Sequence, residues 1–146
     1  MSHRKKILLV EDNGIVAENL ENNFLEYDIE TAYSVNSALD RWEDEGPFDC
    51  IILDLQISPD GLTPNENGLY TPLFGMAVIN KLGAKFAKEE LSEFRKKIII
   101  YSGFIKELKD HSWDNKEIWN TRGLCLLEKS ALSIDEITKY VNNLLK

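Results

Sequence analysis

Residues 49–57 read DCIILDLQI, and this stretch decides the fold. It belongs to an apolar run from Phe48 to Leu53 that only Asp49 interrupts. A short continuous run of this kind, rich in β-branched residues, is typical of a strand buried on both faces of a parallel sheet. An acid, Asp54, follows the run directly. The sequence therefore places a carboxylate at the end of its most hydrophobic strand.

Similar apolar runs lie on both sides of this stretch and alternate with helical patterns. Further strands are expected at 5–10, 29–33, 97–101 and 123–127, and helices at 14–27, 35–45, about 76–94 and 133–145. In the first helix Val16, Leu20 and Phe24 recur every four residues with Leu25 alongside, and Asp12 or Asn13 would cap it. Alternating strands and helices predict a doubly wound α/β fold with a parallel sheet.

Composition limits the class of protein and of partner. At 146 residues the chain fits one globular domain, so residues 1–146 are expected to form a single domain. The net charge of −8 argues against direct binding of a nucleic acid or an anionic membrane, which requires a positive surface. A cation or another protein suits this surface better.

The cysteines and the N-terminus bear on where the protein works. Cys50 and Cys125 lie inside apolar runs and are expected to be buried thiols rather than a disulfide or a metal cluster. The apolar run Ile7 to Val10 is too short for a signal peptide or a membrane span. Both observations favour a cytoplasmic protein.

Chemically useful side chains follow four of the expected strands. Glu11 and Asp12 follow the first, Asp54 the third, Ser102 the fourth and Lys129 the fifth. Each alone has an ordinary explanation as a cap, a turn residue or a solvated charge. In a doubly wound sheet, however, ligands bind beyond the carboxyl ends of the strands. Clustered carboxylates suit Mg²⁺, and a carboxylate can act as a nucleophile in phosphoryl transfer.

The stretches KKILLVEDN, DCIILDLQI, IIIYSG and LLEKS, in this order, resemble the receiver domains of two-component response regulators over essentially the whole chain. The resemblance implies the CheY-like, flavodoxin-like receiver fold, a five-stranded parallel sheet with strand order 2-1-3-4-5. It also implies phosphorelay signal transduction, in which the domain is a phosphoprotein carrying an aspartyl phosphate rather than an enzyme.

Carried over position by position, the resemblance gives each strand-end residue a role. Asp54 would accept the phosphoryl group from a sensor histidine kinase or a phosphotransfer protein. Asp12 and Asp54 would ligate Mg²⁺ directly, Glu11 would help to hold the ion, and the backbone carbonyl of Gln56 would complete the protein ligands.

The remaining roles belong to a hydroxyl and an ammonium. Ser102 would donate its hydroxyl to the phosphoryl group, drawing in the loop after the fourth strand. Lys129 would pair first with Asp54 and then with the phosphoryl group. The rearrangement would change the surface offered to a downstream effector protein, and a homodimer is left open.

The sequence departs from the family pattern after Asp54. The family follows its phosphoacceptor with a short loop containing Met-Pro and then a Gly that opens the next helix. Here that Gly would be Gly75 or Gly68. The choice of Gly75 extends the loop over about 58–74, well beyond the usual 2 to 6 residues or so.

Two further departures lie around Lys129. Leu126 replaces the family's aromatic switch residue, and Ser130 replaces the proline that normally follows the lysine. The Lys129–Ser130 peptide bond is therefore either trans or a strained cis bond. These changes keep a second interpretation open, a receiver-like interaction module that is not phosphorylated. A third, less favoured interpretation is a metal-dependent phosphohydrolase with an aspartyl phosphate, but enzymes of that kind place an acid where this chain has Gln56.

Overall fold

The computed structural model describes residues 4–57, 75–103, 105, 123–130 and 133–146. Within them the strands are β1 (Lys6–Val10), β2 (Asp28–Ala32), β3 (Cys50–Leu53), β4 (Ile98–Ser102) and β5 (Cys125–Glu128). The helices are α1 (Gly14–Asn23), α2 (Val35–Glu45), α3 (Gly75–Gly83), α4 (Lys88–Lys96) and α6 (Ser133–Leu145). The predicted alternation of strands and helices is confirmed, with boundaries displaced mostly by one or two residues.

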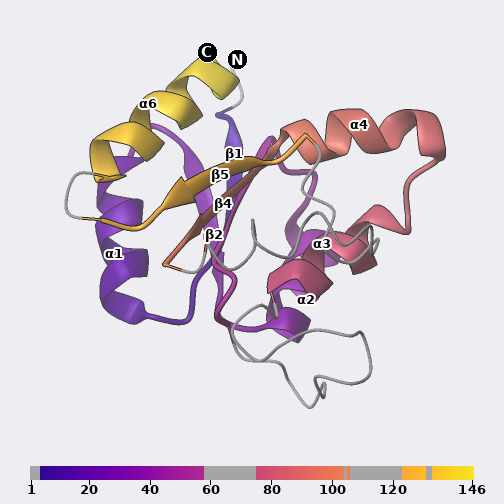
Figure 1. The fold of residues 1–146 in the computed structure, drawn as a ribbon, viewed down its shortest axis with the longest axis horizontal. Helices are drawn as coiled ribbons and strands as arrows, with labels where there is room; N and C mark the ends of the chain where they lie inside the picture. The colour runs from indigo at the N-terminus through magenta and orange to yellow at the C-terminus, as the bar shows by residue number, and fades with distance from the viewer. Residues whose placement is uncertain (1–3, 58–74, 104, 106–122, 131–132) are drawn as a thin grey trace.

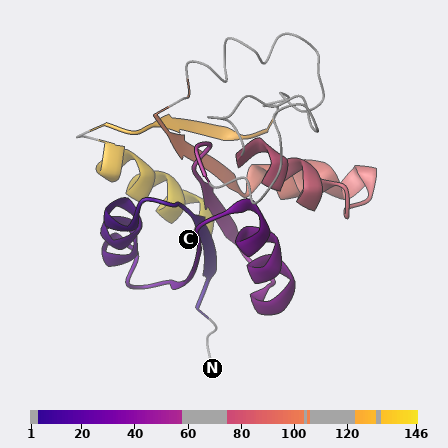
Figure 2. The ribbon, with the colours of Figure 1, turned by 90° about the horizontal axis from the view of Figure 1, so that it is seen from below.

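The strands form one parallel sheet in the order β2-β1-β3-β4-β5, which confirms the predicted doubly wound topology. Helices α1 and α6 cover one face, and α2 and α3 cover the other (Figures 1 and 2). In register, Val10 lies beside Leu53 and Leu53 beside Ile100. The residues that follow these positions are therefore brought to the same edge of the sheet.

Both faces of the sheet are buried, as the continuous apolar runs predict. On the face covered by α1 and α6, the side chains over Ile52 of β3 come from both helices. They are Leu20 of α1, Phe24 at the C-terminal end of α1, and Ile137 and Val141 of α6. On the opposite face, Trp42 of α2 lies near the rings of Phe48, Phe86 and Phe94, the last of these on α4. Burial on two faces explains why β3 has no polar position.

The ends of α1 differ in part from the prediction. Asn13 caps the helix, because its Oδ1 accepts hydrogen bonds from the N–H groups of Ile15 at 3.0 Å and Val16 at 3.2 Å. Asp12 is thereby left for another role. The helix ends at Asn23 instead of continuing to residue 27, so Leu25 lies off its apolar face and is 75% exposed. The prediction that Leu25 lies alongside the apolar positions of this helix is wrong.

The single helix predicted over about 76–94 is also wrong, since two helices occupy this stretch. α3 ends at Gly83 and α4 begins at Lys88. The Glu90 side chain accepts a hydrogen bond from the Ala87 N–H at 3.2 Å, which caps the start of α4. The apolar periodicity continues across the break, and it alone does not reveal the interruption.

Further sequence expectations concern the cysteines, a peptide bond and the membrane. Both cysteines are free thiols; Cys50 is buried as expected, whereas Cys125 is only half-buried. Among the described residues, one peptide bond is cis, the one between Gly46 and Pro47. The Lys129–Ser130 bond is therefore trans. No helix in the described ranges is long and apolar enough to span a bilayer.

The extended loop predicted over 58–74 lies outside the residues that the structure describes, as does Gly68.

Candidate functional site

The carboxyl ends of β1 and β3 bring together three acids. Glu11, Asp12 and Asp54 each offer a carboxylate oxygen, and these oxygens all lie within 4.8 Å of one another. Glu11 and Asp54 are only 2% and 5% exposed, whereas Asp12 faces solvent. The predicted convergence of these acids is confirmed.

Backbone hydrogen bonds fix the two buried acids. The Glu11 N–H donates to the Ala32 carbonyl at 2.9 Å, and the Asp54 N–H donates to the Val10 carbonyl at 2.9 Å. These bonds extend the strand ladders by one residue past β1 and β3. The carboxylates are consequently held by the sheet and not by a loop.

Lys129 lies between the two buried carboxylates. Its Nζ donates to Glu11 Oε2 at 2.7 Å and to Asp54 Oδ2 at 2.9 Å. The predicted pairing with Asp54 is therefore present, and the pairing with Glu11 is an addition that sequence reasoning missed. One ammonium faces three carboxylates, so the site has an excess of negative charge.

The other predicted site residues lie close by in the chain or in the sheet. Ser102 ends β4 and is fully buried, and its carbonyl accepts a hydrogen bond from the Lys129 N–H at 3.1 Å. Gln56 follows Asp54 in the turn after β3, and its N–H donates to Asp54 Oδ1 at 3.2 Å. Its carbonyl as a metal ligand stays a prediction.

Gly75 permits the close approach of α3 to the site. Its N–H donates to the Leu55 carbonyl at 2.8 Å. A Cβ at this position would lie 2.3 Å from the Asp54 carbonyl oxygen and 2.8 Å from the Leu55 Cα. Only glycine fits such a contact with backbone atoms. α3 as the structure describes it begins at Gly75, one of the two glycines considered from the sequence.

The acids respond electrostatically to one another and to burial. Burial raises the pKa of Glu11 from its ordinary 4.5 to about 7, the hydrogen bond from Lys129 opposes the rise, and the Asp54 charge adds to it. Burial and the Asp54 charge also raise the pKa of Asp12. Burial lowers the pKa of Lys129, but its bonds to Glu11 and Asp54 outweigh this and raise it overall.

The donor set fits Mg²⁺ better than it fits a softer metal. All three side chains offer hard carboxylate oxygens, and the described cluster contains no His or Cys ligand. Burial and, to a smaller extent, the Asp54 charge raise the pKa values of Glu11 and Asp12, and a divalent cation would offset both effects by favouring the ionised carboxylates. The residues present therefore suit a magnesium ion.

The raised pKa of Glu11 predicts a pH dependence of stability without metal. Between the unfolded pKa of 4.5 and the folded pKa of about 7, the folded protein keeps a proton that the unfolded chain has lost. The contribution of Glu11 to the free energy of unfolding should therefore fall as the pH rises through this window, by roughly 1–3 kcal/mol. Urea unfolding of the wild type and of Glu11→Gln, at several pH values in EDTA, measures it.

The difference between the two proteins isolates Glu11 from the other titrating groups. Saturating Mg²⁺ should make the fall smaller, because the ion binds the ionised carboxylate. If the free energy of unfolding in EDTA depended on pH in the same way in the wild type and in Glu11→Gln, the assignment of this pH dependence to Glu11 would be contradicted.

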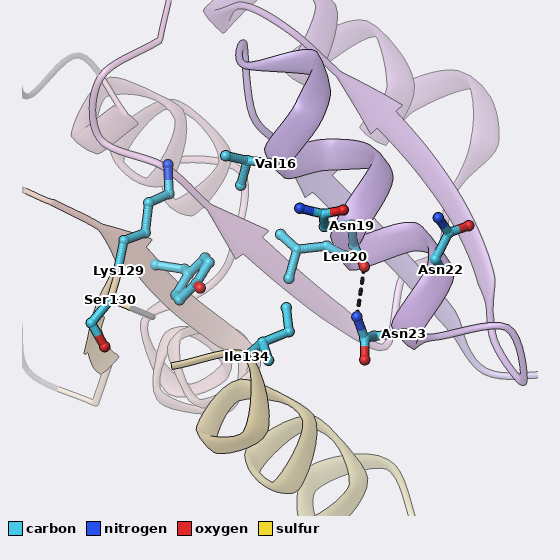
Figure 3. A pocket seen from close by; sticks show the side chains of 9 residues that line it. Val16, Asn19, Leu20, Asn22, Asn23, Lys129, Ser130 and Ile134 are labelled. Atoms are coloured by element: carbon cyan, nitrogen blue, oxygen red, sulfur yellow. Dashed lines mark hydrogen bonds between the residues drawn. The ribbon is translucent and has the colours of Figure 1, made fainter. Parts of the chain in front are cut away.

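A pocket of about 590 Å³ lies beside Lys129 on the α1 and α6 side. Figure 3 shows Asn19, Asn22 and Asn23 of α1 on one side, Lys129 and Ser130 on the other, and Ile134 of α6 below. Of the described residues that line it, Lys129 is the charged one. Tyr101 also lines the pocket, and the Lys129 ammonium lies near its ring. This contact was not predicted from the sequence. The available signal was an aromatic residue that directly follows a run of three isoleucines and precedes Ser102.

Comparison with known proteins gives matches in structure and not in sequence. No protein-family model and no curated protein sequence matches the chain. Many solved structures do match, and many of these are response regulator receiver domains.

Three matches illustrate the range. A Francisella response regulator receiver domain is 21% identical, with a TM-score of 0.65 over 97% of this chain and 96% of that one. The response regulator TrrA of Thermotoga maritima, solved with Mg²⁺ and BeF, is 25% identical, with a TM-score of 0.64 over 97% and 99%. A structure named adenylate cyclase from Rhodopirellula baltica is 17% identical, with a TM-score of 0.65 over 98% and 88%. The chain thus has the CheY-like receiver fold of response regulators.

Proposed function

We propose that the chain is a phosphoacceptor receiver domain of a two-component system, and that Asp54 carries the phosphoryl group. The observation that supports this best is the contact of Lys129 Nζ with both Asp54 and Glu11, beside an acid cluster with oxygens within 4.8 Å. A fold by itself does not imply a function, so the proposal depends on these site residues.

The proposed reaction is the transfer of a phosphoryl group from a phosphohistidine to a carboxylate. An Asp54 oxygen attacks phosphorus, the phosphorus–nitrogen bond of the donor breaks as the phosphorus–oxygen bond forms, and the histidine nitrogen leaves. The donor would be a sensor histidine kinase or a phosphotransfer protein. Mg²⁺, held by Asp12, Asp54, Glu11 and the Gln56 carbonyl, would offset the charge of the phosphoryl oxygens.

The residues around Asp54 would stabilise the product. Lys129 already contacts Asp54 Oδ2, and it would pair with a phosphoryl oxygen after transfer. Ser102 would donate its hydroxyl to another phosphoryl oxygen. The hydrogen bond from the Lys129 N–H to the Ser102 carbonyl links the two residues, so a movement of one would shift the other. This rearrangement would change the surface that a downstream effector protein binds.

The proposal includes the setting of the domain. Residues 1–146 would be a single receiver domain with an extended loop at about 58–74, working in the cytoplasm. It would not be a dedicated enzyme, although one structural match is named adenylate cyclase. The unphosphorylated interaction module is the second candidate, favoured by Leu126 and Ser130.

The test is incubation with acetyl phosphate and Mg²⁺, followed by intact mass spectrometry. The wild type should gain one phosphoryl group, whereas Asp54→Asn and the wild type in EDTA should gain none. An adduct that persists in Asp54→Asn would overturn the assignment of Asp54. Absence of any adduct would favour the interaction module, and rapid release of phosphate over many turnovers would favour the phosphohydrolase.

A further inference from the structure

The Lys129 side chain has different surroundings on its two sides. On one side its ammonium meets Glu11 and Asp54 at 2.7 and 2.9 Å. On the other lies the pocket of about 590 Å³, where no second charge lies among the described lining residues. Lysine has a long flexible stem that can adopt many rotamers. A group on the pocket side that restricts this stem would therefore favour the paired position.

Tyr101 is in the right place to provide this restriction. It lies on β4 one residue before Ser102, and it is only 5% exposed. Its sheet partner on β5 is Leu127. Lys129 directly follows β5, its N–H donates to the Ser102 carbonyl at 3.1 Å, and its side chain lines the same pocket as Tyr101. The Lys129 ammonium lies 5.9 Å from the centre of the Tyr101 ring.

The ring offers both attraction and an obstacle. An ammonium within about 6 Å of an aromatic centroid is attracted by the negative face of the ring. The ring is also part of the buried cluster formed with α1 and α6, which limits its own movement. A leucine in its place would offer neither the charge interaction nor the same volume.

We propose that Tyr101 is a positioning residue that holds the Lys129 ammonium against Asp54 and Glu11 and away from the pocket beside it. The role rests on the proposed function, because a well-placed Lys129 matters most during phosphoryl transfer to Asp54. Tyr101 acts through Lys129 and does not itself contact the reacting atoms.

The test compares Tyr101→Phe, which keeps a ring, with Tyr101→Leu, which does not. The rate constant of acetyl phosphate labelling in saturating Mg²⁺ should fall about 3- to 10-fold in Tyr101→Leu and stay within about twofold in Tyr101→Phe. Phe24→Leu removes a buried ring of the same cluster that does not line the pocket beside Lys129, and it should leave the rate unchanged. Equal losses in Tyr101→Phe and Tyr101→Leu would overturn the proposal.

A double variant separates positioning from general packing. In a Lys129→Met background, Tyr101→Leu should slow labelling no further, because the residue through which it acts is gone. A further loss there would show a structural role and sink the idea.

A spectroscopic measurement keeps the proposal testable if the Lys129→Met background labels too slowly. The ε-methylene protons of Lys129 should carry a ring-current shift in the wild type and in Tyr101→Phe, and lose it in Tyr101→Leu. An unchanged shift in Tyr101→Leu overturns the proposal. Absence of labelling in the wild type would instead defeat the proposed function, while the shift would still report the contact.

Discussion

Replacement of Lys129 by Met is expected to slow labelling of Asp54 by about 100-fold and to lower the metal-free free energy of unfolding by about 1–3 kcal/mol. The side chain contacts two carboxylates that are 2% and 5% exposed. Without the ammonium they face each other with no described cation between them. Methionine preserves most of the stem, so the loss reports the charge.

Mg²⁺ provides an internal check on this explanation. Since the ion supplies positive charge at the same carboxylates, it should restore more stability to Lys129→Met than to the wild type. Urea unfolding with and without Mg²⁺ measures the difference. Lys81→Met, at an exposed position of α3, is the matched control and should change neither quantity. Equal effects of Mg²⁺ on the wild type and on Lys129→Met would contradict the proposed role of the ammonium.

Replacement of Gly75 by Ala is expected to damage both stability and labelling. A methyl group would approach the Asp54 carbonyl oxygen to 2.3 Å, and backbone atoms cannot yield as a side-chain end can. Either α3 or the turn after β3 must move. The free energy of unfolding should fall by about 1–3 kcal/mol. Labelling should slow as well, because the displaced backbone carries the nucleophile.

Gly14→Ala is the matched control for this prediction. Gly14 also begins a helix, but a Cβ there would meet nothing within 4 Å. Its effect should stay within about 0.5 kcal/mol. Thermal and urea unfolding of both variants give the comparison. A Gly75→Ala protein as stable and as quickly labelled as Gly14→Ala would show that the close contact is not needed.

The strand pattern and the acids at the strand ends could be predicted from the sequence. The apolar runs of β1, β3 and β4 favour strands buried on both faces, and parallel strands bring Glu11, Asp12 and Asp54 to one edge. The apolar runs and the acids that follow them can be seen in the sequence itself, and the parallel order of the strands brings these acids together. No knowledge of side-chain packing was needed to find them.

Other features depend on contacts that a linear pattern does not contain. The sequence offered Asp12 and Asn13 as equal caps, and only the fold shows that Asn13 accepts both N–H groups. It likewise could not show that Gly75 lies against the Asp54 backbone, because that contact depends on the folded chain. The bond between Lys129 and Glu11 joins residues 118 positions apart. Such pairings depend on the packing of the whole sheet.

Identification of the labelled residue tests the central claim most directly. Borohydride reduces an aspartyl phosphate to homoserine, which peptide mass spectrometry can locate. After treatment with acetyl phosphate and Mg²⁺, we expect homoserine at position 54, and none when EDTA replaces Mg²⁺. Conversion at position 12 in place of 54, or a phosphoryl group that borohydride does not remove, would contradict the assignment of Asp54 as the phosphoacceptor.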